Sequence, residues 1–120
     1  MTYIYHITIQ EAWEQADRHY TASSLESEGF IHCSTTAQIL QVANAFYRDV
    51  PNLVLLCIDT EKLSADLKWE APAHPKGHKA PPTSDDMLFP HVYGTINLDA
   101  IVDVVDFPQG EKGFTLPDGL

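Results

Sequence analysis

The sequence predicts an α+β fold in which strands outnumber helices. Several short segments have apolar residues at every second position, which is typical of strands with one buried face. Two segments instead have apolar residues every three or four positions, which is typical of amphipathic helices. The order along the chain is strand, helix, strand, helix and then mostly strands, which favours α+β over a regularly alternating parallel sheet. We expect residues 1–120 to form a single domain, because a chain of this length can bury roughly two-thirds of its unfolded surface.

The first strand is expected to turn directly into the first helix. In residues 3–9, YIYHITI, tyrosine and isoleucine alternate with a second set of side chains that includes His6 and Thr8. Thr8 and Glu11 have the spacing of a capping box, in which two side chains satisfy free backbone N–H groups at a helix start. Helical spacing then relates Ala12, Trp13, Ala16 and Tyr20, so a helix is predicted from about Ile9 to Arg18.

A loop, a strand and a second helix are predicted next. Residues 19–28 are rich in small polar side chains and have no clear period, so we expect a loop with one turn near SSLESEG. A short strand is expected over residues 30–33. Ser34, Thr35 or Thr36 can cap the helix that follows, whose apolar stripe continues towards the next proline.

Strands dominate the second half of the chain. The continuous apolar run from Leu53 to Ile58 predicts a central strand covered on both faces. A short irregular or helical piece is expected to lead from there into the Lys-Trp-Glu string. Residues 71–87 contain several prolines and glycines along with charged side chains, so a mobile loop is predicted there. Strand character returns in residues 89–93 and again in residues 96–105, and the tail from residue 107 predicts a closing hairpin or an extended edge.

The charge of the chain restricts the class of ligand. The chain carries 17 acidic and 7 basic side chains, a net charge of −10, which disfavours binding to extended nucleic acid and to anionic membranes. Lys68, Lys76 and Lys79 nevertheless lie in one stretch together with His74 and His78. This stretch is a candidate patch for a nucleotide phosphate; the alternative is a solvated loop.

The N-terminal residues and the two cysteines indicate a cellular location. The first residues lack the basic start and apolar core of a secretion signal, and no apolar run is long enough to cross a bilayer. A cytoplasmic protein is therefore expected. Cys33 and Cys57 both fall in predicted strands, and in a reducing compartment we expect two buried, unpaired thiols.

Three histidines interrupt short apolar strands: His6 in YIYHITI, His32 in GFIHCST and His91 in FPHVYG. Histidine is unusual in the middle of a strand, because both ring nitrogens need partners and the ring titrates near neutral pH. Three of them on segments far apart in the sequence predict a polar cleft assembled from several strands. The alternative is three separate histidines, each satisfied by backbone or water.

Strand geometry selects the neighbours of these histidines. Phe30, His32 and Ser34 share one face of their strand. Cys33 lies on the other face, so it cannot readily form a nucleophilic dyad with His32. Tyr93 likewise shares a face with the third histidine. If these faces converge, the cleft contains imidazoles, a serine hydroxyl and a phenol, which can bind ribose hydroxyls or an amide.

Three other chemistries are open to these residues. Three neutral imidazoles can hold a catalytic zinc ion, as in a metal-dependent hydrolase, but no two histidines have the spacing of a metal-binding pair on regular structure, so no metal site is predicted. Ser34 is not in a nucleophile-elbow motif, and a helix cap explains it. Glu28, Asp59 and Glu70 are candidate general bases.

Several strings together resemble one known family. YHIT, Trp13, SLESEGFIHCST followed by QVANAFY, LLCID, KWE and FPHVYG are similar to the mainly bacterial domain-of-unknown-function family 952. The resemblance spans Tyr3 to about Val105, and GFIHCS and FPHVYG are its most specific strings.

That resemblance implies a distant relationship to the ADP-ribosyltransferase-like fold, a split, mostly antiparallel α+β sheet with two main helices that holds NAD in a cleft between its halves. His6 stands where that superfamily contacts the nicotinamide-side ribose. His32 and Ser34 stand where it frames the nicotinamide pocket. His91 stands on the later strand where many members use a glutamate, whereas the RNA 2'-phosphotransferase branch relies on histidines and arginines.

The resulting hypothesis is a cleft that binds NAD or an ADP-ribose-containing nucleotide, with ADP-ribosyl transfer as the reaction. No firmly bound cofactor is implied, since NAD would be the substrate, and no protein partner is specified. Glu70 is the candidate carboxylate to stabilise positive charge on the ribose. The alternative is a noncatalytic small-ligand or protein-binding module on the same fold. The candidate catalytic residues are His6, His32 and His91, and the candidate ligand-binding residues are Ser34, Tyr20, Glu70, Tyr93, Lys76 and Lys79.

Overall fold

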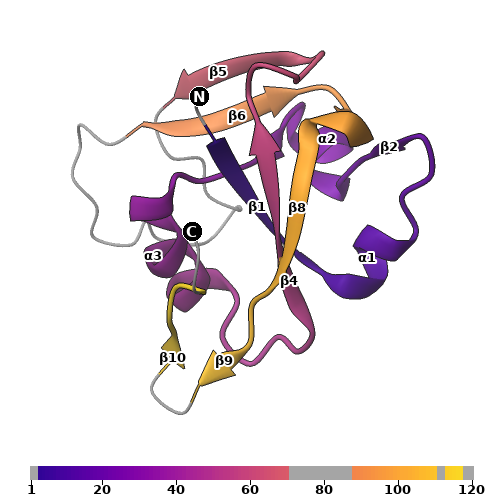
Figure 1. Cartoon of the computed structure of the whole chain (residues 1–120). Coiled ribbons are helices and arrows are strands. Elements are labelled where there is room, and N and C mark those ends of the chain that lie inside the picture. The colour runs from indigo at the N-terminus through magenta and orange to yellow at the C-terminus, as the bar shows by residue number, and fades with distance from the viewer. Residues whose placement is uncertain (1–2, 71–87, 111–112, 118–120) are drawn as a thin grey trace.

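The computed structural model describes residues 3–70, 88–110 and 113–117, and these contain two three-stranded antiparallel sheets (Figure 1). The first sheet has the strand order β1–β4–β8, and the second has the order β3–β6–β5. Two shorter antiparallel pairs join β2 with β7 and β9 with β10. The predicted α+β class with mostly antiparallel strands is confirmed. The strands are β1 (Tyr3–Ile9), β2 (His19–Tyr20), β3 (Ile31–His32), β4 (Leu53–Asp59), β5 (Asp66–Glu70), β6 (Phe89–Tyr93), β7 (Ile96–Asn97), β8 (Ile101–Asp106), β9 (Gln109–Gly110) and β10 (Gly113–Phe114).

The helices of the described residues cover both faces of the first sheet. Figure 1 shows α3 on one side of it and α1 and α2 on the other. Side chains from α3 pack against one apolar cluster, and side chains from α1 and α2 pack against a second cluster on the opposite face. The helices are α1 (Gln10–Glu14), α2 (Ser23–Glu28) and α3 (Thr36–Phe46), and a short 3-10 helix spans Leu98–Ala100.

Strand β4 lies at the centre of the first sheet, as its apolar run predicts. It pairs with β1 on one edge and with β8 on the other, and all of its residues are buried. Val54, Leu56 and Ile58 belong to one core cluster, while Leu55 and Cys57 belong to the other. The alternation of side chains along a strand therefore fills two cores at once, which explains why polar residues are missing from this run.

The two sheets meet at a single backbone bridge between Tyr5 of β1 and Ser34, just after β3. The Tyr5 N–H donates to the Ser34 carbonyl at 2.8 Å, and the Ser34 N–H donates to the Tyr5 carbonyl at 2.7 Å. The Cys33 N–H donates to the Pro90 carbonyl of β6 at 3.1 Å, so the ladder continues into the second sheet. This seam places His6 of the first sheet beside His32 of the second.

The first helix is shorter than its sequence period predicts, and its start differs. It ends at Glu14, whereas the sequence pattern extends to Arg18. The predicted capping box is wrong, because Ile9 occupies the N-cap position and no side chain caps the helix. Thr8 instead contacts the Tyr20 hydroxyl. Tyr20 lies on β2, where pairing with β7 overrides the helical period that suggested a longer helix.

The second of the two predicted helices corresponds to α3, and it begins at one of the three expected capping residues. Thr35 occupies the N-cap position of α3, and its N–H donates to Gln38 Oε1 at 3.0 Å in a capping box. Ser34 therefore has the bridging role described above instead of a capping role. Ile39 and Ala43 are fully buried against the first sheet, which confirms the predicted apolar stripe.

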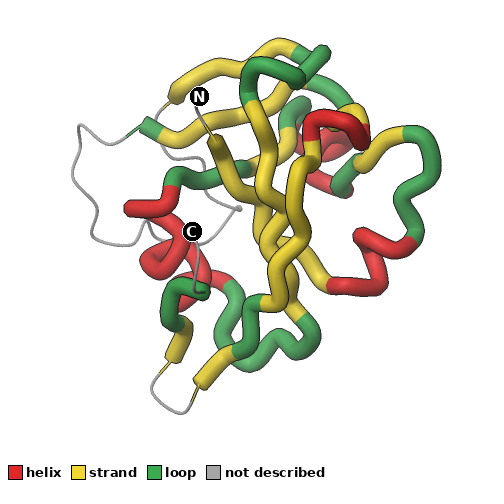
Figure 2. The backbone as a smooth tube through the Cα atoms, in the orientation of Figure 1, coloured by secondary structure: helices red, strands yellow, loops and turns green. Residues whose placement is uncertain are grey.

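The second half of the chain follows its predicted order with two corrections (Figure 2). The strand expected at residues 96–105 is divided into β7 and β8 by a 3-10 helix. The Lys-Trp-Glu string and the preceding leucine form strand β5, where an irregular or helical piece was expected for that leucine. The predicted strand at residues 89–93 coincides with β6, and β9 with β10 pair as the expected hairpin. The loop predicted at residues 71–87, with Lys76 and Lys79, lies outside the described residues.

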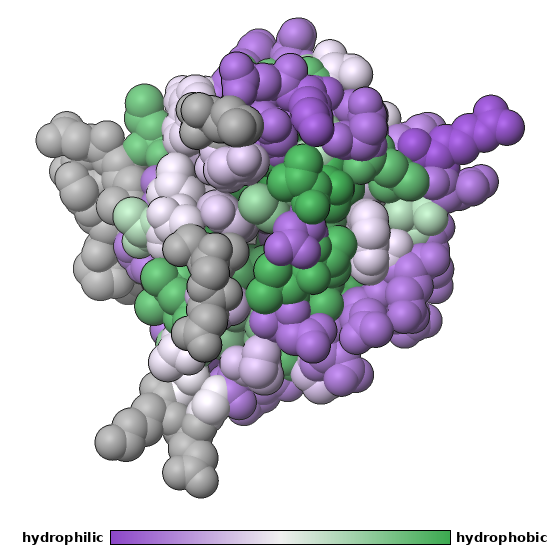
Figure 3. Space-filling model, in the orientation of Figure 1, coloured by the Kyte–Doolittle hydropathy of each residue, from purple (hydrophilic) through white to green (hydrophobic). Residues whose placement is uncertain are grey.

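Burial and surface character agree with a folded, acidic protein. Cys33 and Cys57 are buried free thiols, as expected. Hydrophilic side chains cover much of the margin of the face in Figure 3, and an apolar area lies over the strands of the first sheet. Among the described residues, no helix is long and apolar enough to span a membrane.

Candidate functional site

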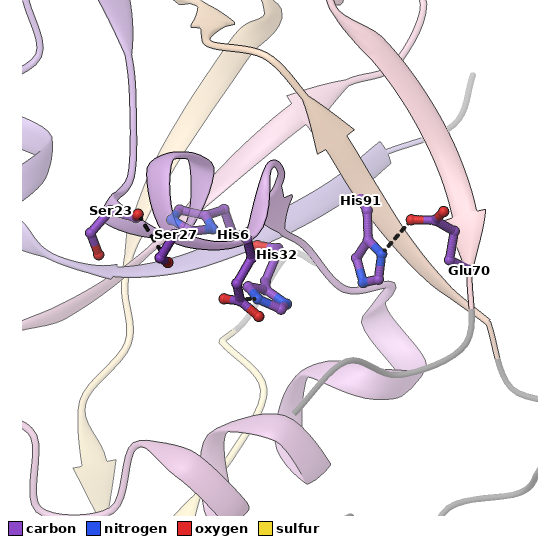
Figure 4. Close-up of polar contacts among 7 residues, drawn as sticks. His6, Ser23, Ser27, His32, Glu70 and His91 are labelled. Carbon is purple, nitrogen blue, oxygen red and sulfur yellow. Dashed lines mark hydrogen bonds and ion pairs between the residues drawn. The ribbon is translucent and has the colours of Figure 1, made fainter. Parts of the chain in front are cut away.

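Two histidines meet on one face of the second sheet and are surrounded by acidic and aromatic side chains. His32 of β3 and His91 of β6 are directly opposite each other in the strand register. Side chains alternate between the two faces of a strand, and the neighbouring residues Ile31 and Val92 are fully buried in one core cluster. The two imidazoles therefore lie on the opposite face of the sheet from that cluster. We call the set His32, His91, Glu28, Glu70, Phe30 and Tyr93 the His–Glu cluster (Figure 4 shows four of these side chains, with His32, Glu70 and His91 labelled).

The inner half of the cluster joins His91 to Glu70 of the neighbouring strand β5. His91 Nδ1 lies 2.9 Å from Glu70 Oε1, and the Tyr93 hydroxyl donates to the same oxygen at 2.5 Å. The Tyr93 bond, followed by the His91 bond, lowers the pKa of Glu70. Burial of the ring lowers the pKa of His91. At neutral pH we therefore expect an ionised Glu70 that accepts a hydrogen bond from the Nδ1–H of a neutral His91, which leaves His91 Nε2 as an acceptor.

The outer half of the cluster joins His32 to Glu28 at the end of α2. Gly29 ends this helix in the left-handed region, with φ of 90°, a conformation that glycine adopts without a steric cost. This turn brings the last helical residue next to the strand that follows. His32 Nε2 lies 2.9 Å from Glu28 Oε2, and the two side chains are 35% and 31% exposed. The outer pair is therefore in contact with solvent.

Aromatic rings fill the space around the two imidazoles. The Phe30 ring is stacked on His91, with centroids 4.2 Å apart and planes 20° apart. The same ring meets His32 edge-on at 4.9 Å and Tyr93 at 5.3 Å. The His32 and His91 centroids are 5.5 Å apart. The Lys68 ammonium lies 4.7 Å from the centre of the Tyr93 ring, in the geometry of a cation–π contact.

His6 lies behind this cluster, in the core. Its Nδ1 is 2.6 Å from the His32 carbonyl, and its Nε2 is 2.9 Å from the Tyr20 hydroxyl. The Tyr20 hydroxyl also shares a 2.9 Å hydrogen bond with the Thr8 hydroxyl. Burial lowers the pKa of His6 to about 4, so the ring is neutral at pH 7. Because a carbonyl can only accept, Nδ1 carries the proton and Nε2 accepts from Tyr20.

The structure separates the predicted site residues into groups. His32, His91, Glu70 and Tyr93 come together in the His–Glu cluster, whereas His6 and Tyr20 form a buried pair beside it. Ser34 is buried at the seam between the sheets, with its backbone in the bridge to β1. Lys76 and Lys79 lie outside the described residues. Of the other candidate bases, Asp59 accepts the Glu61 N–H at 3.0 Å within a turn.

One member of the site, Phe30, was not identified from the sequence as functional, and Lys68 was expected in a phosphate-binding stretch with Lys76 and Lys79 instead of at this cluster. Phe30 has the same strand face as His32, so alternation already contained the signal for it. Lys68 is opposite His91 in the β5–β6 register, and no local pattern predicts that pairing. Glu28 was a candidate base, but its partner follows only from the turn at Gly29.

The described residues contain no arrangement suited to a metal ion. Among them, no three histidine, cysteine, aspartate or glutamate side chains come together in a way that could hold one. One surface hollow lies elsewhere, between the start of α1 and residues 50–52, and it contains none of the histidines.

The comparisons with known proteins decide the family. The family model described as "Protein of unknown function (DUF952)" matches residues 7–104. The chain belongs to this family. No curated protein matches the chain.

Solved structures of one bacterial protein are similar to this chain. The crystal structure of protein CC0527 from Caulobacter crescentus has a TM-score of 0.75 and 29% identity, covering 94% of this chain and 92% of that one. The solution NMR structure of CC0527 has a TM-score of 0.72 and 29% identity, with coverage of 95% and 91%. The DUF952 chain described here therefore shares the overall fold of CC0527 over nearly its whole length.

Proposed function

We propose that the His–Glu cluster binds NAD or another ADP-ribose-containing nucleotide, and that the reaction is ADP-ribosyl transfer on an ADP-ribosyltransferase-like fold. One observation carries the proposal: the Glu70 carboxylate is held ionised by two donors, Tyr93 and His91, and its side chain is still 38% exposed. The seam between the two antiparallel sheets agrees with a split-sheet architecture.

The chemistry requires a fixed negative charge near the ribose. When the bond between the ribose anomeric carbon and the nicotinamide nitrogen breaks, nicotinamide leaves with the electron pair and positive charge develops on the sugar. A carboxylate held in place before the reaction stabilises that charge without having to reorganise. Both donors contact Glu70 Oε1, and among the described residues no donor contacts Oε2. Oε2 is therefore the oxygen that would face the ribose.

The histidines have different roles in this proposal. His91 orients Glu70 through Nδ1, and its Nε2 can accept the proton that the acceptor group loses on forming the new bond. His32 would contact the ligand from the solvent side. His6 stays in the core and holds the His32 backbone, since both of its ring nitrogens already have partners. Contact of Lys76 and Lys79 with the diphosphate remains part of the proposal.

The test combines binding with turnover. Titration of the protein with NAD and with ADP-ribose is expected to shift the NMR signals of His32 and His91. Incubation with NAD is expected to release nicotinamide, and Glu70→Gln is expected to lower that rate by about a hundredfold or more, as the loss of a stabilising charge does elsewhere. Asp106→Asn, on the exposed edge of β8, is the matched control and should leave the rate unchanged. No shift with either nucleotide would contradict the proposal.

A noncatalytic binding module is the second candidate. The observation in its favour is that His91 is only 2% exposed and lies under the Phe30 ring, so reactants would have to displace Phe30 to reach it. This candidate predicts the same NMR shifts with no release of nicotinamide and no effect of Glu70→Gln on chemistry.

A further inference from the structure

The solvent side of the His–Glu cluster carries net negative charge. Glu28 and Glu70 are 31% and 38% exposed, so both carboxylates reach solvent. Lys68 is two residues before Glu70 on β5, and its positive charge helps to lower the pKa of that carboxyl. The Lys68 ammonium lies over the Tyr93 ring. Among the residues that the structure describes, the cluster therefore has two carboxylates and one ammonium, within a chain of net charge −10. A cationic group is attracted to these two carboxylates, and an anionic group such as the diphosphate of a nucleotide would have to lie away from them.

Flat aromatic surfaces accompany the two carboxylates. Phe30 is half-buried and touches both imidazoles, and Tyr93 lies 5.3 Å from it. Aromatic faces attract cations, and planar cations such as guanidinium also stack on them. The carboxylates can at the same time accept hydrogen bonds from the edge of such a cation. Shape and charge thus favour a flat, positively charged group.

A buried acceptor in the cluster has no donor among the residues that the structure describes. His91 donates through Nδ1 to Glu70, so its Nε2 carries a lone pair on the other side of the ring. The side chain is 2% exposed, and no hydrogen bond to Nε2 exists within residues 3–70, 88–110 and 113–117. Buried acceptors are normally paired, so this atom calls for an N–H or O–H donor from a ligand.

We propose that the His–Glu cluster recognises a planar organic cation that bears N–H donors, and that Glu28 sets the preference for its charge. The inference rests on the same site as the proposed function and names its ligand chemistry. Two groups have this chemistry: the guanidinium of an arginine acceptor and the pyridinium carboxamide of oxidised NAD. In both, Glu28 and Glu70 would balance the charge, Phe30 would stack on the plane, and His91 Nε2 would accept a hydrogen bond from an N–H group.

Matched pairs of small ligands test the inference without any catalysis. NMR titration compares N-acetylarginine amide with N-acetylcitrulline amide, its neutral isostere, and compares 1-methylnicotinamide, a cation, with neutral nicotinamide. At least one cation is expected to bind several-fold more tightly than its neutral counterpart, with shifts at Phe30 and His32. Which pair shows the difference identifies the guanidinium or the pyridinium. Equal affinity within both pairs would overturn the inference.

A variant of the exposed carboxylate sharpens the test. Glu28→Gln is expected to weaken the preferred cation about fivefold and to leave its neutral isostere unchanged, since one partly exposed charge is removed. Glu26→Gln, an exposed carboxylate two residues earlier on α2, is the matched control. Loss of affinity for both members of a pair would show a structural effect and count against the charge role of Glu28. A cation preference without nicotinamide release would leave this inference standing and remove the proposed transfer reaction.

Discussion

His6 of the first sheet and the two histidines of the second sheet have hydrogen-bond partners of opposite kinds, although the three rings lie close together. His6 has only neutral partners, a carbonyl and a phenol, and its ring is in the core. His32 and His91 each have a carboxylate, from Glu28 and Glu70. A histidine with neutral partners and no solvent stabilises a fold, whereas a histidine oriented by a carboxylate can bind or transfer a proton. The type of partner therefore separates structure from function here.

The largest expected effect is the loss of stability when His6 is removed from the core. His6→Ala removes a core ring and leaves the His32 carbonyl and the Tyr20 hydroxyl without their partner, so the free energy of unfolding should fall by about 2–4 kcal/mol. His32→Ala, which removes a partly exposed pair, should cost no more than about 1 kcal/mol. Urea denaturation of both variants measures the difference. Similar losses for the two variants would contradict the assignment of His6 to structure.

A loss of stability of similar size is expected when the pH is lowered, because of the pKa of His6. The pKa of His6 falls from its ordinary value of 6.5 in the unfolded chain to about 4 in the folded protein. Between these values the unfolded state binds the proton and the folded state does not, so stability is full above pH 6.5 and is lost as the pH falls towards 4. The loss amounts to about 3 kcal/mol. Denaturation curves between pH 7 and pH 4 should be flatter for His6→Gln than for the natural protein, and equal slopes would contradict this pKa.

The same substitution at two tyrosines gives the smallest effects and the sharpest contrast. Tyr20→Phe removes the hydroxyl that joins His6 to Thr8 and should cost about 1–2 kcal/mol of stability. Tyr93→Phe should change stability less than this, because its partner Glu70 is partly exposed, but it should raise the pKa of that carboxyl. Chemical denaturation and carboxyl NMR titration measure the two results. A rise in the pKa of Glu70 in the Tyr20 variant instead would reverse the comparison.

Local pattern was sufficient for much of the fold. The apolar run of β4, the strand at Phe89–Tyr93 and the stripe of α3 all depend on which neighbours in the sequence are apolar, and that information is local. The first helix was overestimated because Tyr20 has helical spacing in the sequence but pairs through β2 with β7 in the fold. Strand pairing between distant segments overrides such a period, and nothing near Tyr20 encodes it.

The candidate site was predictable by residue and less so by arrangement. The histidines were recognised because they interrupt apolar strands, and alternation placed His32 on one face with Phe30 and His91 on one face with Tyr93. The direct opposition of His32 and His91 in the register, and the arrival of Glu70 from β5, depend on the pairing of three strands that are far apart in the sequence. The separation of His6 from the cluster also required the fold, since side-chain alternation gives a face but does not say whether that face is covered.

Through the hydrogen bond from His6 to the His32 carbonyl, the position of His32 in the second sheet depends on a side chain of the first sheet. The outward imidazole is held at its side chain by Glu28 and at its main chain by a ring from a different sheet. A random mutagenesis screen scored on ligand capture should therefore recover changes at position 6 alongside those at the carboxylates, although no ligand ever touches that residue.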